Sequence, residues 1–131
     1  MRLFLSLFTV LCSFSAPAEE KACTVEKAHE AVIAKLFSGA EHLYSVLWWS
    51  DPSSEVINAR SFVINGRDSI PIFSSEAEGR SQLAGSGLEK ELVGIEPKLL
   101  AGVLQKMEYA ILNPGGVRPV QFRTCILKKY L

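Results

Sequence analysis

The chain has 131 residues, with 14 Lys and Arg against 14 Asp and Glu, and 48% of its residues are hydrophobic. This length suits a single domain, and the even charge balance argues against a nucleic-acid-binding protein, which ordinarily carries a basic excess. A charged fraction of 21% with 9% aromatic residues indicates a globular and not a disordered protein. The mean hydropathy of +0.19 is high for a small soluble domain, and the first residues account for much of it.

Residues 1–18 have the layout of a secretory signal peptide. Arg2 is followed by an apolar run over residues 3–14, and Ala16 and Ala18 form the small-residue motif that precedes a cleavage site. The run is shorter than the roughly 20 apolar residues of a membrane span. We therefore predict cleavage after Ala18, one domain over residues 19–131, a periplasmic or secreted location, and no stable membrane insertion. Retention of this segment as an N-terminal helix is the alternative.

Removal of the signal peptide leaves Cys23 and Cys125 as the only cysteines. In an oxidising compartment, such a pair near the two chain ends favours a disulfide. Two buried, inert thiols are the first alternative and a reactive thiol is the second. No Cys-x-x-Cys motif is present, and no histidine lies near either cysteine in the sequence.

The first part of the mature chain predicts a helix and then a strand. Thr24 is a candidate helix cap, and Ser38-Gly39 is a natural stop. Residues 43–49 are rich in aromatic and branched side chains and predict a strand with two apolar faces, central in its sheet. The apolar positions of the helix recur every three or four residues and predict one buried stripe: Val25, Ala28, Val32 and Leu36, with Ile33 and Phe37 beside it.

Asn65-Gly66 is the strongest local indication of secondary structure in the chain. It lies between the apolar runs 60–64 and 67–73 and predicts a β-hairpin with a type I′ turn, because both residues tolerate positive φ. Pro71 lacks the N–H that a strand donates to its neighbour. We therefore expect an edge position or a bulge at Pro71.

Ser75 with Glu78 forms a capping box and predicts a short helix to about Leu83, which the glycines at 85–87 end. We expect strands at 89–95 and 108–112, an extended segment at 117–122, and a tail that continues as a strand to about Leu127. A helix is expected from Pro97, with a buried stripe of Leu99, Leu100, Val103, Leu104 and Met107. The sum is an α+β (mixed α/β) domain in which three helices cover a sheet of about five strands.

The segment Ile70-Pro71-Ile72-Phe73-Ser74-Ser75-Glu76 resembles the "vP-v-F-T-S-e-e" segment in the N-terminal domain of SseB-like proteins, a family named for enhanced serine sensitivity. In that family a short helix, a strand, a leucine-rich helix and a strand ending in Leu-Asn-Pro follow. Residues 89–95, 97–107 and 111–115 supply the same order, and the resemblance covers residues 62–116. It implies an SseB N-terminal-like α/β fold, a role as a binding or accessory module, no cofactor, and no catalytic residue to assign.

No grouping of residues in the sequence points clearly to catalysis. Nucleophilic hydrolysis requires a serine or cysteine beside a base, and there is no Gly-x-Ser-x-Gly elbow. Only His29 and His42 are available as the usual base, so a small hydrolase that uses Cys125 or a serine with His42 stays an alternative. The spacing of the two histidines matches no zinc motif, and we expect no metal and no cofactor.

The remaining features are those of recognition. Trp48 and Trp49 would place one indole on each side of a strand, and tryptophan is enriched in interface hot spots; burial of both indoles under helices is the alternative. We expect an exported, non-enzymatic accessory protein that binds a protein partner in the periplasm. An immunity-type inhibitor of a periplasmic toxin and a small-ligand carrier are further alternatives. The candidate binding residues are Trp48, Trp49, Phe73, Ser74, Ser75 and Glu76.

Overall fold

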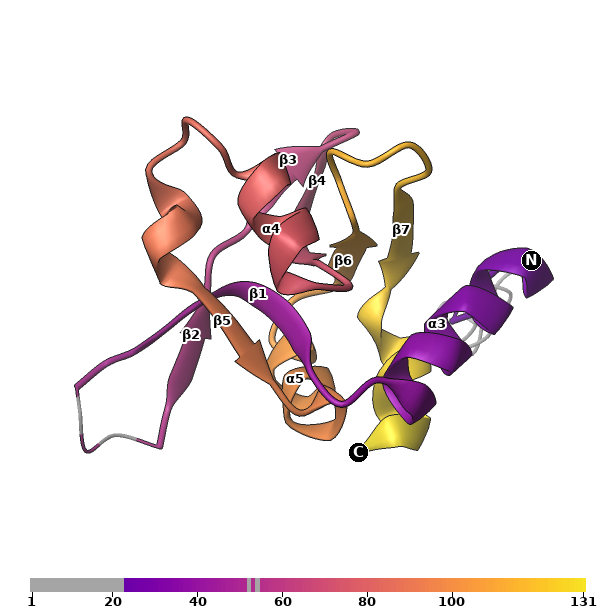
Figure 1. The fold of residues 1–131 in the computed structure, drawn as a ribbon. Helices are drawn as coiled ribbons and strands as arrows, with labels where there is room; N and C mark the ends of the chain where they lie inside the picture. The colour runs from indigo at the N-terminus through magenta and orange to yellow at the C-terminus, as the bar shows by residue number, and fades with distance from the viewer. Residues whose placement is uncertain (1–22, 52, 54) are drawn as a thin grey trace, which may run out of the picture.

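The computed structural model describes residues 23–51, 53 and 55–131 and has an α+β fold, as expected (Figure 1). The predicted signal peptide, with its cleavage after Ala18, lies outside the described residues. No helix in the described part is long and apolar enough to cross a membrane. The elements follow in the order α3 (Lys27–Gly39), β1 (Leu43–Trp49), β2 (Ile57–Ala59), β3 (Phe62–Ile64), β4 (Arg67–Ile72), α4 (Glu76–Gln82), the 3₁₀ helix η1 (Leu88–Glu91), β5 (Leu92–Ile95), α5 (Pro97–Leu104), β6 (Tyr109–Leu112), β7 (Val120–Arg123) and the 3₁₀ helix η2 (Thr124–Tyr130).

The strands of the described residues form two small sheets. The first has the antiparallel order β2-β1-β5, and the second has the order β3-β4-β6-β7, in which β4 and β6 run parallel. The expectation of one sheet with about five strands is therefore wrong. The sequence reading missed β2, because three residues are too few to show a strand period.

The N-terminal end of β1 joins the two sheets. The Tyr44 N–H donates to the Phe73 carbonyl at 3.0 Å, and the Phe73 N–H donates to the Tyr44 carbonyl at 2.8 Å. Next to this bridge, the buried Ser45 hydroxyl donates to the Pro71 carbonyl at 2.6 Å. β1 is central in its own sheet, as predicted, and is also tied to the second sheet.

Side chains of β1 alternate between two apolar clusters. Leu43 and Leu47 belong to the main core, which β1 shares with α3, α5, η2 and the second sheet. Val46 belongs to a smaller cluster with Phe73 and Leu83, at the two ends of the segment that contains α4. The apolar character of both faces of β1 is explained by this burial on two sides.

The hairpin between β3 and β4 is confirmed. Asn65 and Gly66 have φ values of 55° and 74°, the positive values that a type I′ turn requires. β4 lies inside its sheet and Pro71 is fully buried, but at Pro71 itself β4 has a strand neighbour on one side only, β6, so the expected edge position holds locally. Pro71 is tolerated there because β3 pairs with β4 only as far as Ser69, so no strand of that ladder requires an N–H from Pro71.

Helix α3 buries a different face from the expected one. Its buried side chains are Ile33 and Phe37, one turn apart, whereas Val32 is 41% exposed. Thr24 lies before the helix and does not cap it. The reason is tertiary: the ring of Phe37 lies 5.6 Å from that of Tyr130, so contact with η2 sets the rotation of the helix.

The predicted cap of α4 is confirmed, since the Ser75 hydroxyl accepts a hydrogen bond from the Glu78 N–H at 3.1 Å. The Glu78 carboxylate does not complete the capping box and instead accepts from the Gln82 amide at 2.8 Å. The expected strand at 89–95 begins as η1 and becomes extended only in β5. In α5, Leu100, Val103 and Leu104 of the predicted stripe are buried, whereas Leu99 is 49% exposed. Met107, the last residue of the predicted stripe, lies beyond the end of the helix.

The expected extension of the tail as a strand to Leu127 is wrong. After β7 the buried Thr124 donates its hydroxyl to the Met107 carbonyl at 2.5 Å and its N–H to the Glu108 carbonyl at 2.9 Å. The Gln105 side-chain amide donates to the Thr124 carbonyl at 2.8 Å. These bonds to the connection between α5 and β6 turn the chain into η2, which buries Leu127 in the main core.

A substitution at Gly94 of β5 can test how tightly β5 packs against β1. Gly94 pairs with Tyr44, and a Cβ at Gly94 would lie 2.4 Å from Cε2 of the Tyr44 ring. We expect Gly94→Ala to lower the free energy of unfolding by about 1–3 kcal/mol, measured by urea denaturation. Gly39→Ala is the control, because its Cβ would meet nothing within 4 Å, and we expect it to leave that free energy unchanged or slightly raised. Equal midpoints for the two variants would contradict this account.

Candidate functional site

Two adjacent tryptophans lie exposed at the end of β1. Trp48 is 41% exposed and Trp49 is 39% exposed, so neither indole is buried under a helix. Both pair with β2 on one side, whereas β5 pairs with β1 only as far as Val46 on the other. Successive strand residues point to opposite faces, so the two indoles project to the two sides of the sheet.

An arginine covers part of Trp48. The Arg60 N–H donates to the Val46 carbonyl at 3.0 Å, and the guanidinium carbon of Arg60 lies 5.6 Å from the centre of the Trp48 ring. Glu91 of η1 lies 3.4 Å from Nη2 of the same guanidinium. A cation over an indole is attracted by the negative face of the ring. We call Trp48, Trp49, Arg60 and Glu91 the tryptophan surface.

The segment before η1 positions Glu91. Gly85 and Gly87 both have φ of 83°, a conformation that glycine adopts without steric cost. The Gly85 N–H donates to the Glu89 carboxylate at 3.2 Å. Backbone N–H groups, first that of Glu89 itself and then those of Gly85 and Gly87, lower the pKa of the Glu89 carboxyl. This carboxylate therefore links the glycine turn to the helix that carries Glu91.

A largely apolar hollow, whose lining also includes Glu55 and Lys106, lies beside β2 on the Trp49 side. Trp49 pairs with Ile57, and Ile57 lines a hollow of about 330 Å³ together with Val56 and Leu99. The side chains of Val56 and Leu99 are 53% and 49% exposed. Apolar surface is therefore available on both sides of the end of β1.

The structure separates Phe73 from the tryptophan surface. Phe73 is fully buried, so its side chain is not available to a partner. It pairs with Tyr44, which precedes Trp48 by four positions on β1, a separation of about 13 Å at the usual strand rise. The predicted binding residues thus fall into two groups at opposite ends of one strand.

The other members of the second group already have partners inside the chain. The Ser74 N–H donates to the Asn113 side-chain oxygen at 3.3 Å, and the Ser75 hydroxyl caps α4. Glu76 is exposed and forms an ion pair with Arg80 at 2.7 Å. These contacts explain the polar residues after Phe73 as a connection between β4 and α4.

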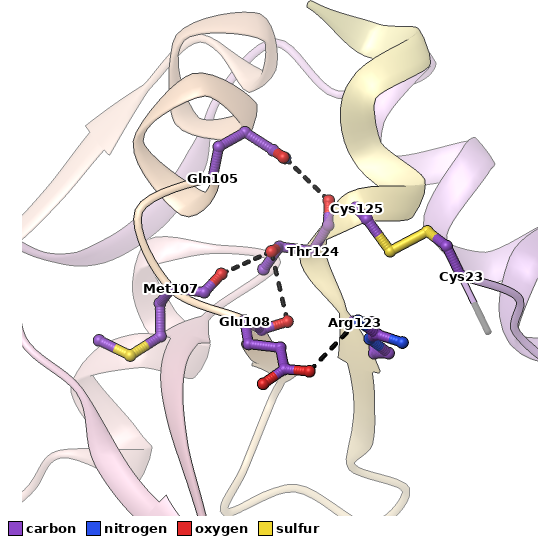
Figure 2. Close-up of a disulfide and its surroundings, with 7 residues drawn as sticks. All are labelled: Cys23, Gln105, Met107, Glu108, Arg123, Thr124 and Cys125. Atoms are coloured by element: carbon purple, nitrogen blue, oxygen red, sulfur yellow. Dashed lines mark hydrogen bonds and ion pairs between the residues drawn. A yellow bond between two sulfur atoms is a disulfide. The ribbon is translucent and has the colours of Figure 1, made fainter. Parts of the chain in front are cut away.

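The predicted disulfide is confirmed and joins Cys23 to Cys125 across 102 positions of the chain. Figure 2 shows the bond beside Thr124, whose hydroxyl points to the Met107 and Glu108 carbonyls. The bond therefore attaches the segment before α3 to a firmly held part of η2. With its sulfur bonded, Cys125 is not available as a thiol nucleophile in this form.

The tryptophan surface unites two predicted residues, Trp48 and Trp49, with Arg60 and Glu91, which sequence reasoning missed and for which no local signal exists. Within the described residues, no group of three or more His, Cys, Asp or Glu is placed to hold a metal ion. No family model matches the chain, and no curated protein and no solved structure matches it.

The disulfide is expected to contribute about 2–4 kcal/mol to the free energy of unfolding, because it closes a long loop in the unfolded chain. Urea denaturation with and without dithiothreitol measures this contribution. The variant Cys23→Ser/Cys125→Ser should match the reduced wild-type protein and should not respond to dithiothreitol. An unchanged midpoint after complete reduction, verified by thiol counting, would refute the expectation.

Proposed function

We propose that the protein is an exported, non-enzymatic module that binds a protein partner in the periplasm through the tryptophan surface. The observation that carries the proposal is the exposure of Trp48 and Trp49, consecutive residues at the end of β1 whose indoles project to opposite sides of the sheet. Burial of such large side chains by a partner is favourable, and tryptophan is enriched in interface hot spots. The signal-peptide pattern of residues 1–18 supports the export part of the proposal.

Arg60 suggests the chemistry of the partner. Its guanidinium carries five N–H donors, is 43% exposed, and uses only the 3.4 Å contact to Glu91 in its ion pair. A partner segment with an apolar side chain against the indoles and a carboxylate near Arg60 would satisfy both parts of the surface. An immunity-type inhibitor is the special case in which this partner is a toxin.

The resemblance to SseB-like proteins supports an accessory role. After Phe73 the chain continues with α4, η1, β5, α5 and β6, and β6 ends at Leu112, the first residue of Leu112-Asn113-Pro114; apart from η1, this is the order that the resemblance implies. The site of this proposal is nevertheless the end of β1, which lies outside residues 62–116.

The test uses the fact that Trp48 and Trp49 are the only tryptophans in the chain, so selectively excited tryptophan fluorescence reports on this surface alone. The partner is first captured from periplasmic extract with the wild-type protein, identified and purified, and then titrated. We expect a shift of tryptophan emission to shorter wavelength as the partner excludes water from the indoles. The double variant Trp48→Ala/Trp49→Ala should bind the purified partner at least about 30-fold more weakly, as expected for hot-spot residues.

The control variant is Val63→Ala, which removes a side chain that is 71% exposed on β3. It should bind the partner with wild-type affinity, and circular dichroism should show the same fold for both variants. Wild-type affinity in the folded double variant would exclude the tryptophan surface as the binding site.

A further inference from the structure

A second hollow, distinct from the tryptophan surface, lies between the start of α3 and the second sheet. Its volume is about 330 Å³. One wall is the segment of residues 24–26 with His29, and the other includes Arg67, Tyr109 and Arg123. We call these last three residues and the hollow beside them the arginine pocket.

The three residues of the arginine pocket share one face of the sheet. Tyr109 pairs with Arg123 on β7 and with Ser69 on β4, and Arg67 lies two positions before Ser69. Residues that pair across strands, or that are two apart on one strand, point to the same side. The guanidinium carbon of Arg67 lies 4.7 Å from the centre of the Tyr109 ring.

The two guanidinium groups are incompletely paired. In the part of the chain that the structure describes, Arg67 has no ion-pair partner, and Arg123 has one, Glu108, at 3.2 Å. The Nε of Arg123 is buried and has no hydrogen-bond partner among the described residues. Glu26 is the one carboxylate in the wall of the hollow; it is 77% exposed and lies 3.6 Å from His29. Glu108 and Glu26 thus balance the two arginines in number, and Arg67 is the guanidinium group that lacks a carboxylate partner among the described residues.

The polar side chain beside the arginines is fixed. The Gln121 amide nitrogen donates to the buried Ser69 hydroxyl and to the Ile64 carbonyl, both at 2.8 Å. Its amide oxygen accepts from the Asn65 side chain at 3.3 Å. Both N–H groups of Gln121 are engaged, so the side-chain donors left for a ligand are those of the two arginines, the Tyr109 and Thr24 hydroxyls and His29.

The disulfide holds the opposite wall in place. Residues 24–26 follow Cys23 directly, and Cys23 is bonded to Cys125, two positions after Arg123. Figure 2 shows Arg123 beside this bond, with its guanidinium group directed to Glu108. The two walls are thus connected covalently at one end of the hollow.

We propose that the arginine pocket binds a small molecule through a carboxylate or phosphate group. The guanidinium forks of Arg67 and Arg123 match the oxygens of either group. The disulfide positions the wall formed by residues 24–26, so binding depends on the oxidised state. This site is independent of the partner proposed for the tryptophan surface.

The test is isothermal titration calorimetry of the oxidised protein at low ionic strength, with inorganic phosphate and with succinate as probes. We expect binding of one molecule per chain for at least one probe, and the probe that binds identifies the oxyanion. Arg67→Gln and Arg123→Gln should each weaken binding at least about tenfold, because each removes a charged donor pair. Arg118→Gln, which removes an exposed arginine outside the pocket, should keep the affinity within about twofold.

Three results would overturn the proposal: no heat of binding with either probe, wild-type affinity in both pocket variants, or an equal loss in Arg118→Gln. Thermal denaturation verifies that each variant is folded, and Arg67→Lys, which keeps the charge, should restore part of the affinity. Dithiothreitol should weaken binding by the wild-type protein to the level of Cys23→Ser/Cys125→Ser. Unchanged affinity after reduction would refute the role of the disulfide. Trp48→Ala should bind the probe normally, which separates this site from the tryptophan surface.

Discussion

Burial of β1 on both faces is the constraint on which the rest of the structure depends. The strand sends Leu43 and Leu47 into the main core and Val46 into the smaller cluster, so neither apolar cluster is complete without it. Its contacts to Phe73 and Pro71 also join the two sheets. The Ser45 hydroxyl is fully buried, and its bond to the Pro71 carbonyl removes the cost of an unsatisfied polar group at this junction.

The same strand explains where the exposed tryptophans lie. β5 stops pairing at Val46, while β1 continues for three residues with β2 as its neighbour. The side chains beyond this point leave the core, and Trp48 and Trp49 become partly exposed. The arginine pocket has a different origin, because it depends on the second sheet and on the disulfide that brings residues 24–26 to β7. One domain thus carries two separate surfaces with different chemistry.

Features that depend on neighbours along the chain were predicted correctly from the sequence. The bounds of β1 follow from a run of aromatic and branched residues, and the hairpin follows from the φ values that Asn65 and Gly66 tolerate. The cap at Ser75 requires only the N–H three residues later. The strand pattern also predicts a candidate surface at Trp48 and Trp49, because a strand points successive side chains to opposite faces.

Features that depend on distant partners were not predictable in this way. The rotation of α3 is set by contact between Phe37 and η2, and the turn into η2 is set by the bonds of Thr124 to the connection between α5 and β6. The side-chain stripe of a helix and the extended propensity of a tail contain no information about these contacts. The local pattern therefore predicts the wrong buried face for α3 and a strand where the C-terminal segment forms the 3₁₀ helix η2.

By itself, the sequence determined the α+β class, the main turn, the principal strand and the presence of two tryptophans at one strand end, and it favoured a disulfide between Cys23 and Cys125 that the structure confirms. Only the tertiary structure decided that the strands divide into two sheets. Only the tertiary structure also placed Arg60 between Trp48 and Glu91, although Arg60 and Glu91 are 31 positions apart in the sequence. It also decided that Arg67 and Arg123 share one sheet face. The physical reason is that periodicity and turn chemistry act over a few residues, whereas strand register and charge proximity arise only when distant segments pack together.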